Sequence, residues 1–532
     1  MEARKVISLV LNAHLPFVRD FHMGDDYLSS SIEEGWFFES LSETYIPLLQ
    51  ALDRLEGDHI PFRLGISVSP LFCQMLGDEI SQKKYLAHID RQIEFGRREM
   101  ERTAAQGELA VLAKMYFDSA LNTRIAFTGR YEMNILKAFN HYQQKGKIEL
   151  LTTSASHAFL PFLSQYPEAI QAQMEVAIAS HRHCFGRHTQ GFWLPELGWT
   201  EGIENYLRHY NFGYTIVDTH GLVFGNPYPS RGSFYPVKTP QGIFILGRDF
   251  QAAQDIPRMV RDGVYRANNR DAGYELSPEE LDAFLSPDGM RMQTGFKYWR
   301  STVHRGENLI YDPAAASDKA KEHARIFLES QSSRLAEAAK YMGETPISLC
   351  AFDADSFGRY WHEGVQFLEA LFRLNFGYRE IQFMTPSEYL YKQDITGFET
   401  SMPDFSSWGY NGYAETWLDA SNDWMYRHLV RSIDRMTEMA ERFPADSGLK
   451  ERTLNQAARE ILLVQSSDWS KMLYNQDSTE YARNQIEGSL RNFTTIYEAL
   501  GSNYISTEWL TNLERRHNVF PHINYRVFRR KR

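Results

Sequence analysis

Seven short apolar runs recur along the chain, and each ends in polar or aromatic residues. They are VISLVLNAHLPF at 6–17, FRLGISVSP at 62–70, IELLTTSASHAFLP at 148–161, GFWLPE at 191–196, YTIVDT at 214–219, IFILGRD at 243–249 and ISLCAFDADSFG at 347–358. Runs this short and this apolar are typical of strands that are buried on both faces of a parallel sheet. Amphipathic helical patterns separate several of them, for example at 167–186 and at 316–343. This alternation predicts an α/β barrel.

Two regions break the strand rhythm. Residues 73–145 are helical and charged in pattern, with no strand signal, which predicts a helix-rich insertion in a barrel made of residues 1–72 and 146–400. Helical patterns also fill the chain from residue 401 to residue 532, and these predict a separate C-terminal helical domain. The basic tail RVFRRKR is interpreted as a solvated end.

The residue that ends each apolar run is a candidate for the functional site. Active sites of such barrels form at the carboxyl ends of the strands, so these side chains would share one mouth. The candidates are His14, His157, Glu196, Asp218, Arg248, Asp249 and Asp353. The alternative is that each one only caps the helix after its strand, which suits Asp218 but not His14 or Glu196.

Composition narrows the class of partner. The chain has 532 residues and is 43% hydrophobic, enough for a large core, and its formal net charge is −11. An acidic chain is a poor partner for nucleic acid or an anionic membrane, so a neutral partner is expected. Aromatic residues make up 14% of the chain. Many of them lie beside carboxylates and histidines, as in a carbohydrate cleft, although a large aromatic core explains most of this content.

The chain shows no sign of export, membrane insertion or disulfide bonding. The first apolar run is too short for a signal segment, and no stretch approaches the roughly 18 apolar residues of a membrane span. Three cysteines, Cys73, Cys184 and Cys350, are far apart and odd in number, so no disulfide framework is expected, and Cys184 is interpreted as a structural thiol. We therefore expect a cytoplasmic protein.

Once sites for phosphate, dinucleotide and zinc are excluded, carboxylates among aromatic residues are the candidate reactive groups that remain. The chain has no P-loop, no Gly-rich dinucleotide motif after its first strand and no HExxH. Two carboxylates on either side of a sugar are the apparatus of glycoside hydrolysis, in which one attacks the anomeric carbon and the other moves the proton. Glu196 and Asp353 are the pair that we select.

Several longer motifs agree with this interpretation. NAHLPF, GFWLPE, FDADSFGRYWHEG and SSWGYNGYAETWL, in this order and spacing, resemble the conserved regions of glycoside hydrolase family 57. EEGWFFESLSETYIPLL, the SSDW that ends at Trp469 and the final VFPHINYRVF are most similar to its 1,4-α-glucan branching enzymes. The resemblance covers almost the whole chain.

The resemblance implies a fold and a chemistry. It implies a (β/α)7 barrel with a helical insertion at 73–145 and a C-terminal helical domain at 401–532 that covers the cleft. It implies a retaining mechanism on α-1,4-glucans such as amylose and glycogen, with Glu196 as nucleophile, Asp353 as general acid/base and about 5 to 5.5 Å between their carboxyl groups. The residues it assigns to substrate binding are His14, Trp36, Arg248, Tyr274, Trp361, Trp408, Trp417 and Asp468. No metal and no organic cofactor is expected.

The chain also departs from the family pattern. The first motif has Asn12 where relatives have a second histidine, and the acid/base motif has Asp355, Ser356 and Arg359 at altered positions. The stretch after Asp249 is shorter than in branching enzymes, and it has Tyr274 where a tryptophan is expected. Three hypotheses follow: a branching enzyme, an α-amylase or 4-α-glucanotransferase of the same family, and an inactive glucan-binding homologue.

Overall fold

The computed structural model describes residues 5–19, 30–281, 284–285, 289–301, 308–378 and 381–531. Each of the seven apolar runs contains a parallel strand, which confirms the sequence prediction. The strands are β1 (Lys5–Ala13), β2 (Leu64–Val68), β3 (Ile148–Leu151), β4 (Gly191–Phe192), β5 (Tyr214–Val217), β7 (Phe244–Gly247) and β8 (Ile347–Asp353). Two further short strands, β6 (Val237–Lys238) and β9 (Ile381–Phe383), were not predicted.

The strands form two sheets that join at both edges. One sheet has the order β3-β2-β1-β8, with β9 also paired to β1, and the other has the order β4-β5-β7-β6. A parallel bridge between Thr152 and Phe192 connects β3 to β4, and one between Arg248 and Leu349 connects β7 to β8. The seven parallel strands thus follow one another in a ring, which is the order of a (β/α)7 barrel with two seams held by single bridges.

Side chains from the strands fill the interior of this ring. One buried cluster includes Val6, Val10, Leu151, Trp193, Tyr214, Ile216, Leu246, Ile347 and Leu349. The barrel interior is therefore packed, and a ligand can bind only at its ends.

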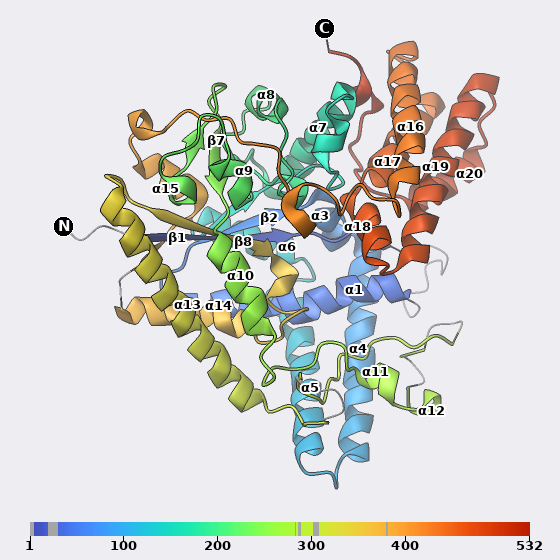
Figure 1. Ribbon diagram of the computed structural model, residues 1–532. Coiled ribbons are helices and arrows are strands. Elements are labelled where there is room, and N and C mark those ends of the chain that lie inside the picture. Colours follow the sequence, from blue (N-terminus) through green and yellow to red (C-terminus); the bar gives the residue numbers. More distant parts are fainter. Residues whose placement is uncertain are drawn as a thin grey trace.

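Helices surround the barrel (Figure 1). They are α1 (Ile32–Ser40), α2 (Ile46–Gly57), α3 (Pro70–Gly77), α7 (Pro167–Phe185), α8 (Ile203–His209), α9 (Thr219–Val223), α10 (Phe250–Val260), α13 (Pro313–Tyr341), α14 (Gly364–Tyr378) and α15 (Pro386–Lys392). Two short helices, α11 (Ala272–Glu275) and α12 (Pro278–Leu281), lie away from the strands, beside the helix labelled α4 in Figure 1. Gly186 ends α7 with a φ of 73°, a left-handed conformation that glycine adopts without strain. The predicted helix at 316–343 is α13, which ends two residues before Gly343.

Both regions without a strand pattern are helical. Residues 73–145 hold the end of α3 and three further helices, α4 (Glu79–Arg102), α5 (Glu108–Ile125) and α6 (Ile135–Gln144). Figure 1 shows α4 and α5 extending together away from the strands. The C-terminal part holds α16 (Asp423–Arg442), α17 (Leu449–Val464), α18 (Ser467–Asn475), α19 (Thr479–Ser502) and α20 (Thr507–Arg516). Among the residues that the structure describes, every helix is too short or too polar to cross a membrane.

Candidate functional site

Glu196 lies in a strained turn just beyond β4. The strand itself covers only Gly191–Phe192, so the run predicted to deliver Glu196 is mostly an irregular extension of it. Glu196 and Leu197 have φ values of 58° and 50°. Such left-handed backbone costs roughly 1–2 kcal/mol per residue, and strain of this kind clusters at functional sites. The backbone N–H of Trp408 donates to the carbonyl of Glu196 at 2.9 Å and helps to hold the turn.

The carboxylate of Glu196 is buried but fully hydrogen-bonded. Its side chain is 3% exposed. Trp408 Nε1 donates to Oε2 at 2.5 Å, and Ser467 Oγ donates to Oε1 at 2.8 Å. Burial raises the pKa of Glu196, the ammonium of Lys471 opposes this rise, and the carboxylate of Asp353 adds to it. The two donors and the cation therefore offset only part of the loss of water around the charged form.

Asp353 is connected to Glu196 through three side chains. Asn12 Nδ2 donates to Asp353 Oδ1 at 3.2 Å and lies 3.4 Å from His157 Nε2. His157 Nδ1 lies 3.1 Å from Ser467 Oγ, whose proton is donated to Glu196. Because that proton is committed, His157 carries its own proton on Nδ1 and accepts from Asn12 at Nε2. A chain of hydrogen bonds thus joins the two carboxylates, and it assigns the tautomer of His157.

His157 stays neutral because of its surroundings. Burial lowers its pKa, and the neighbouring His14 lowers it further. The two imidazole rings stack with centroids 3.9 Å apart and planes inclined by 8°. A neutral His157 is what the chain of hydrogen bonds requires, since a charged ring would have no acceptor at Nε2.

His14 connects the barrel to the C-terminal helices. Its Nδ1 lies 2.9 Å from Ser69 Oγ, and its Nε2 lies 2.9 Å from Asp468 Oδ2 on α18. Burial alone would raise the pKa of Asp468, but His14 holds it below its usual range. The predicted residues His14 and Asp468 therefore form one unit that supports His157 from behind.

A cleft of about 590 Å³ brings the two carboxylates together. Its lining includes five of the predicted site residues, which are Glu196, Arg248, Asp353, Trp408 and Trp417. It also includes residues that the sequence interpretation did not select, notably Tyr360, Tyr410, Lys471, Tyr474 and Asn475. The last three belong to α18, so the C-terminal helices form one wall of the cleft.

Lys471 provides the positive charge of the site. Its pKa is raised, first by Glu196 and then, against burial, by Asp353 and Asp468. Lys471 lies three residues after Asp468 on α18, close to one helical turn, so both side chains face the same way. That spacing is the sequence signal by which Lys471 could have been found.

Arg248 is held firmly at the edge of the cleft. Its Nε donates to the carbonyl of Ala351 at 2.9 Å, and its guanidinium lies 5.2 Å from the ring centroid of Trp408. Asp218 Oδ2 lies 3.7 Å from Arg248 Nη1. The guanidinium therefore orients the tryptophan that donates to Glu196.

Comparison with known proteins identifies the family. Residues 8–401 match the sequence model of Glycosyl hydrolase family 57. The chain belongs to this family. Residues 428–528 match a second model, the C-terminal domain of 1,4-alpha-glucan branching enzyme.

Three relatives show how far the family likeness extends. A 1,4-alpha-glucan branching enzyme from Thermococcus kodakarensis is 27% identical over 97% of this chain and 77% of its own length. The structure of the alpha-amylase AmyC from Thermotoga maritima superposes with a TM-score of 0.92 at 34% identity, covering 99% of this chain and all of that one. The family 57 branching enzyme from Pyrococcus horikoshii superposes with a TM-score of 0.88 at 26% identity, covering 100% of this chain and 98% of that one.

Three residues that the family 57 resemblance assigned to substrate lie away from the cleft. Trp36 and Tyr274 line a separate small cavity, and the edge of Trp36 contacts Tyr481. Trp361 is only 2% exposed and packs among Tyr265, Phe357 and Phe367. Because its ring is enclosed by other aromatic side chains, we assign Trp361 to the hydrophobic core and not to substrate.

Two of the strand-end candidates have structural roles. Asp218 and Asp249 are the N-caps of α9 and α10, with side chains that accept from backbone N–H groups of those helices. Asp249 also receives hydrogen bonds from Arg334 and Ser348. The capping interpretation is therefore right for Asp218 and extends to Asp249.

Two residues at which the motif around Asp353 departs from the family pattern form hydrogen bonds to one neighbouring helix. Arg359 Nε donates to Glu39 Oε2 at 2.8 Å, and Asp355 Oδ2 accepts from Ser40 Oγ at 2.7 Å. Both partners lie at the end of α1, so the two departures are anchored to the same helix. The segment after Asp353 is thereby held in place despite its unusual sequence.

A buried charge cluster supports the same segment. His362 Nδ1 lies 2.8 Å from Glu43 Oε2, and Arg266 forms a bidentate pair with the same carboxylate, with donor–acceptor distances of 3.1 and 2.7 Å. Burial would raise the pKa of Glu43, but Arg266 and His362 hold it well below its usual range. Arg266 lies in the stretch after Asp249, so this stretch is connected directly to the motif that contains Asp353.

Proposed function

We propose that this protein is a 1,4-α-glucan branching enzyme that cleaves an α-1,4 link and passes the cut chain to a 6-hydroxyl of another glucan. One observation carries the proposal: Glu196 and Asp353 line one aromatic cleft whose wall is α18. That helix lies in the segment that matches the branching enzyme C-terminal domain. Relatives from two archaea bear the same enzyme name.

The proposed reaction is a double displacement, the retaining mechanism that the family resemblance implies. Glu196 attacks the anomeric carbon, and Asp353 in its acid form gives a proton to the leaving glycosidic oxygen. The cut chain is then held as an ester on Glu196. Asp353, now a carboxylate, takes the proton of the incoming 6-hydroxyl, whose oxygen displaces the ester. Both carboxyl groups return to their starting states, and the new link keeps the α configuration.

Exclusion of water decides between transfer and hydrolysis. The side chain of Glu196 is almost wholly buried, and we propose that a glucan bound in the aromatic cleft covers the remaining opening and keeps water from the anomeric carbon of the ester. We propose that Tyr360 and Tyr410 are the platforms on which sugar rings stack, because they line the cleft and are 52% and 63% exposed. Trp408 and Trp417 are 8% and 1% exposed and form the supporting wall behind them.

Debranching analysis tests the proposal. Purified protein is incubated with amylose, and the chain-length profile and the number of reducing ends are measured before and after treatment with isoamylase. We expect new short chains only after debranching, with no matching rise in reducing ends before it. The Glu196→Gln variant, which keeps the shape of the side chain, is the matched control and should leave amylose unchanged. An unchanged profile with the wild-type protein would contradict an enzymatic function.

A second candidate is an amylase, and the 34% identity with the T. maritima alpha-amylase favours it. Hydrolysis would produce reducing ends without chains that isoamylase releases. Redistribution of linear chain lengths without branches would instead indicate a 4-α-glucanotransferase. The glycogen-type substrate and the cytoplasmic location remain predictions, and glycogen as an acceptor is tested in the same assay.

A further inference from the structure

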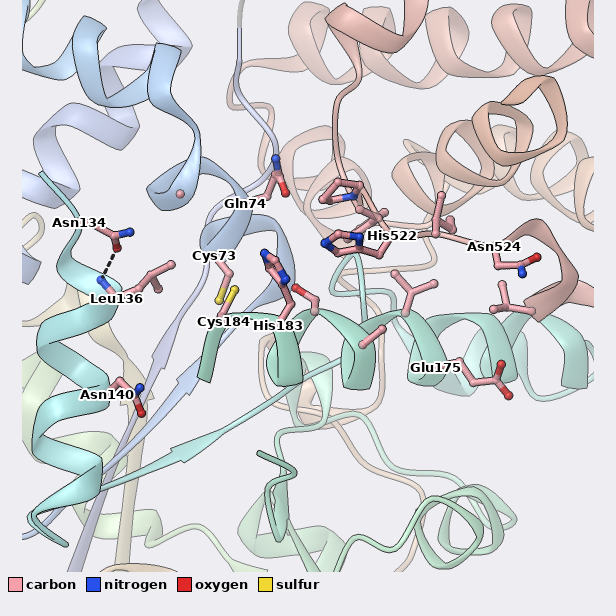
Figure 2. Close-up of a pocket in the computed structure, with 18 of the residues that line it drawn as sticks. Cys73, Gln74, Asn134, Leu136, Asn140, Glu175, His183, Cys184, His522 and Asn524 are labelled. Carbon is pink, nitrogen blue, oxygen red and sulfur yellow. Dashed lines mark hydrogen bonds between the residues drawn. The ribbon is translucent and has the colours of Figure 1, made fainter. Parts of the chain in front are cut away.

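A second cavity lies away from the catalytic cleft and contains a pair of thiols. It has a volume of about 630 Å³ and lies between α3, α6, α7 and the chain at 520–527. None of its lining residues lines the cleft of Glu196. Figure 2 shows the sulfur atoms of Cys73, on α3, and Cys184, near the end of α7, pointing toward each other. Both are free thiols, and both line this cavity.

The two thiols differ in access to solvent. Cys73 is 3% exposed, whereas Cys184 is partly exposed at the cavity wall. The neighbouring thiol of Cys73 lowers the pKa of Cys184, while burial opposes this; the thiol of Cys184, together with burial, raises the pKa of Cys73. Cys184 is therefore the thiol that ionises first and meets a reagent first.

The rest of the lining is mixed: it includes apolar residues and the carboxylate of Glu175, which is paired with Lys531, as well as three basic side chains that suit an anionic reagent. Lys137, His183 and His522 contribute basic side chains, and the two imidazole rings lie 4.5 Å apart. Asn134 and Asn140 add amide groups. Among the residues described, no group of three or more His, Cys, Asp or Glu side chains is placed to hold a metal ion.

We propose that Cys73 and Cys184 form a reversible disulfide by exchange with a low-molecular-weight disulfide, of the kind of oxidised glutathione, that enters this cavity. The thiolate of Cys184 attacks one sulfur of the reagent, and the other half leaves as a thiolate that takes up a proton. The thiol of Cys73 then loses its proton and attacks the sulfur of Cys184, which releases the second half. The protein loses two electrons and two protons, and the reagent is reduced to two thiols.

The burial of Cys73 is compatible with this sequence. Only Cys184 has to meet the reagent, because Cys73 attacks from within the protein. The third cysteine, Cys350, lies on β8, is fully buried and contacts Ser348 Oγ at 3.4 Å. It provides an internal reference that should stay reduced.

The bond would restrain the helix that carries a site residue. Ser69 is the N-cap of α3, and its Oγ lies 2.9 Å from His14 Nδ1. The backbone N–H of Cys73 donates to the carbonyl of Ser69 at 2.9 Å, so the two residues lie one turn apart. A disulfide to α7 would therefore fix α3 and, through Ser69, the imidazole of His14. The effect on activity rests on the proposed function, whereas the formation of the bond does not.

Thiol counting and peptide mapping test the proposal. The full-length protein is equilibrated in buffers of graded reduced and oxidised glutathione, trapped with an alkylating reagent and digested. We expect the wild-type protein to fall from three free thiols to one and to yield a Cys73–Cys184 cross-linked peptide. The Cys350→Ser variant should fall from two to none. The Cys73→Ser variant should instead keep one glutathione on Cys184, and reductant should reverse every change.

Either of two results would overturn the proposal. One is a wild-type protein that retains glutathione on Cys184 without forming the cross-link, which would show that Cys73 cannot attack. The other is a wild-type protein that keeps all three thiols free in the same glutathione buffers in which the Cys73→Ser variant takes up glutathione. Branching activity of reduced and oxidised protein is measured in parallel, with Cys184→Ser as the oxidation-insensitive control. A cross-link without any change in activity would refute the connection through Ser69 but not the disulfide.

Discussion

Replacing Ser467 by alanine tests how the nucleophile stays charged in a buried site. Ser467 Oγ donates to Glu196 Oε1 at 2.8 Å and is itself buried at the start of α18. The substitution removes that donor and leaves Nδ1–H of His157 without its partner, while Trp408 still donates to the other oxygen. The substitution therefore destabilises the ionised form of Glu196 much more than the protonated form.

The size of the effect follows from the strength of the bond. A hydrogen bond to a charged group contributes about 1.5–3 kcal/mol, and one pKa unit corresponds to about 1.4 kcal/mol. Burial already raises the pKa of Glu196, so losing the donor moves it further in the same direction, by about one to two units. The nucleophile must be ionised. Activity is therefore lost as pH falls through the raised pKa, and the acidic limb of the pH profile moves to higher pH.

The assay is the pH dependence of kcat/KM for amylose, compared between wild type and Ser467→Ala. We expect the acidic limb to move up by about one unit or more, with about a tenfold loss near the limb and a smaller loss on the plateau. Ser470→Ala is the matched control, since Ser470 lies on the same helix and its Oγ contacts Tyr426 and not a carboxylate. A loss by the same factor at every pH, with the limb unmoved, would refute the reasoning.

Three further predictions concern charge, position and stability. Lys471→Met removes the cation that favours ionised carboxylates, so kcat/KM should fall about tenfold, and most steeply at acidic pH. Lys471→Arg keeps the charge and should retain most of the activity. An equal loss in both variants would contradict a charge effect. Asn12→Ala removes the donor to Asp353 and should lower kcat about tenfold, with KM unchanged, in steady-state kinetics. A change confined to KM would contradict a positioning role for Asn12. Arg266→Met leaves the buried carboxylate of Glu43 without its bidentate partner. The free energy of unfolding, measured with denaturant, should fall by about 3–5 kcal/mol. Adding Glu43→Gln to this variant should recover part of that free energy.

The sequence predicted those features of the fold and the site that depend on a local pattern of residues. Each barrel strand is a short apolar run with a polar end, so all seven strands were predicted. The rule that active sites form at strand ends gave seven candidates, and the need for two carboxylates selected Glu196 and Asp353 from among them. The strands β6 and β9 were missed because Lys238 and Gln382 interrupt their apolar pattern, whereas the equally short β4 lies in the longer apolar run at 191–196.

Contacts between distant segments left no such pattern. Ser467 lies 271 residues from Glu196 along the chain, and nothing local to Ser467 indicates that it faces a nucleophile. Aromatic residues posed the opposite difficulty, because a ring in the core and a ring in a cleft look alike in sequence. Trp361 was selected although it is buried, whereas Tyr360, its neighbour, lines the cleft and was not selected.

The hydrogen bond between His14 and Asp468 has a consequence for biosynthesis. The two residues are 454 positions apart, so His14 leaves the ribosome long before its partner has been translated. Until then the barrel lacks Ser467 and Lys471 as well, and Glu196 has neither its second donor nor its cation. A nascent chain therefore carries both proposed catalytic carboxylates before the site around them is complete. The proposed activity becomes available only when the last helices dock.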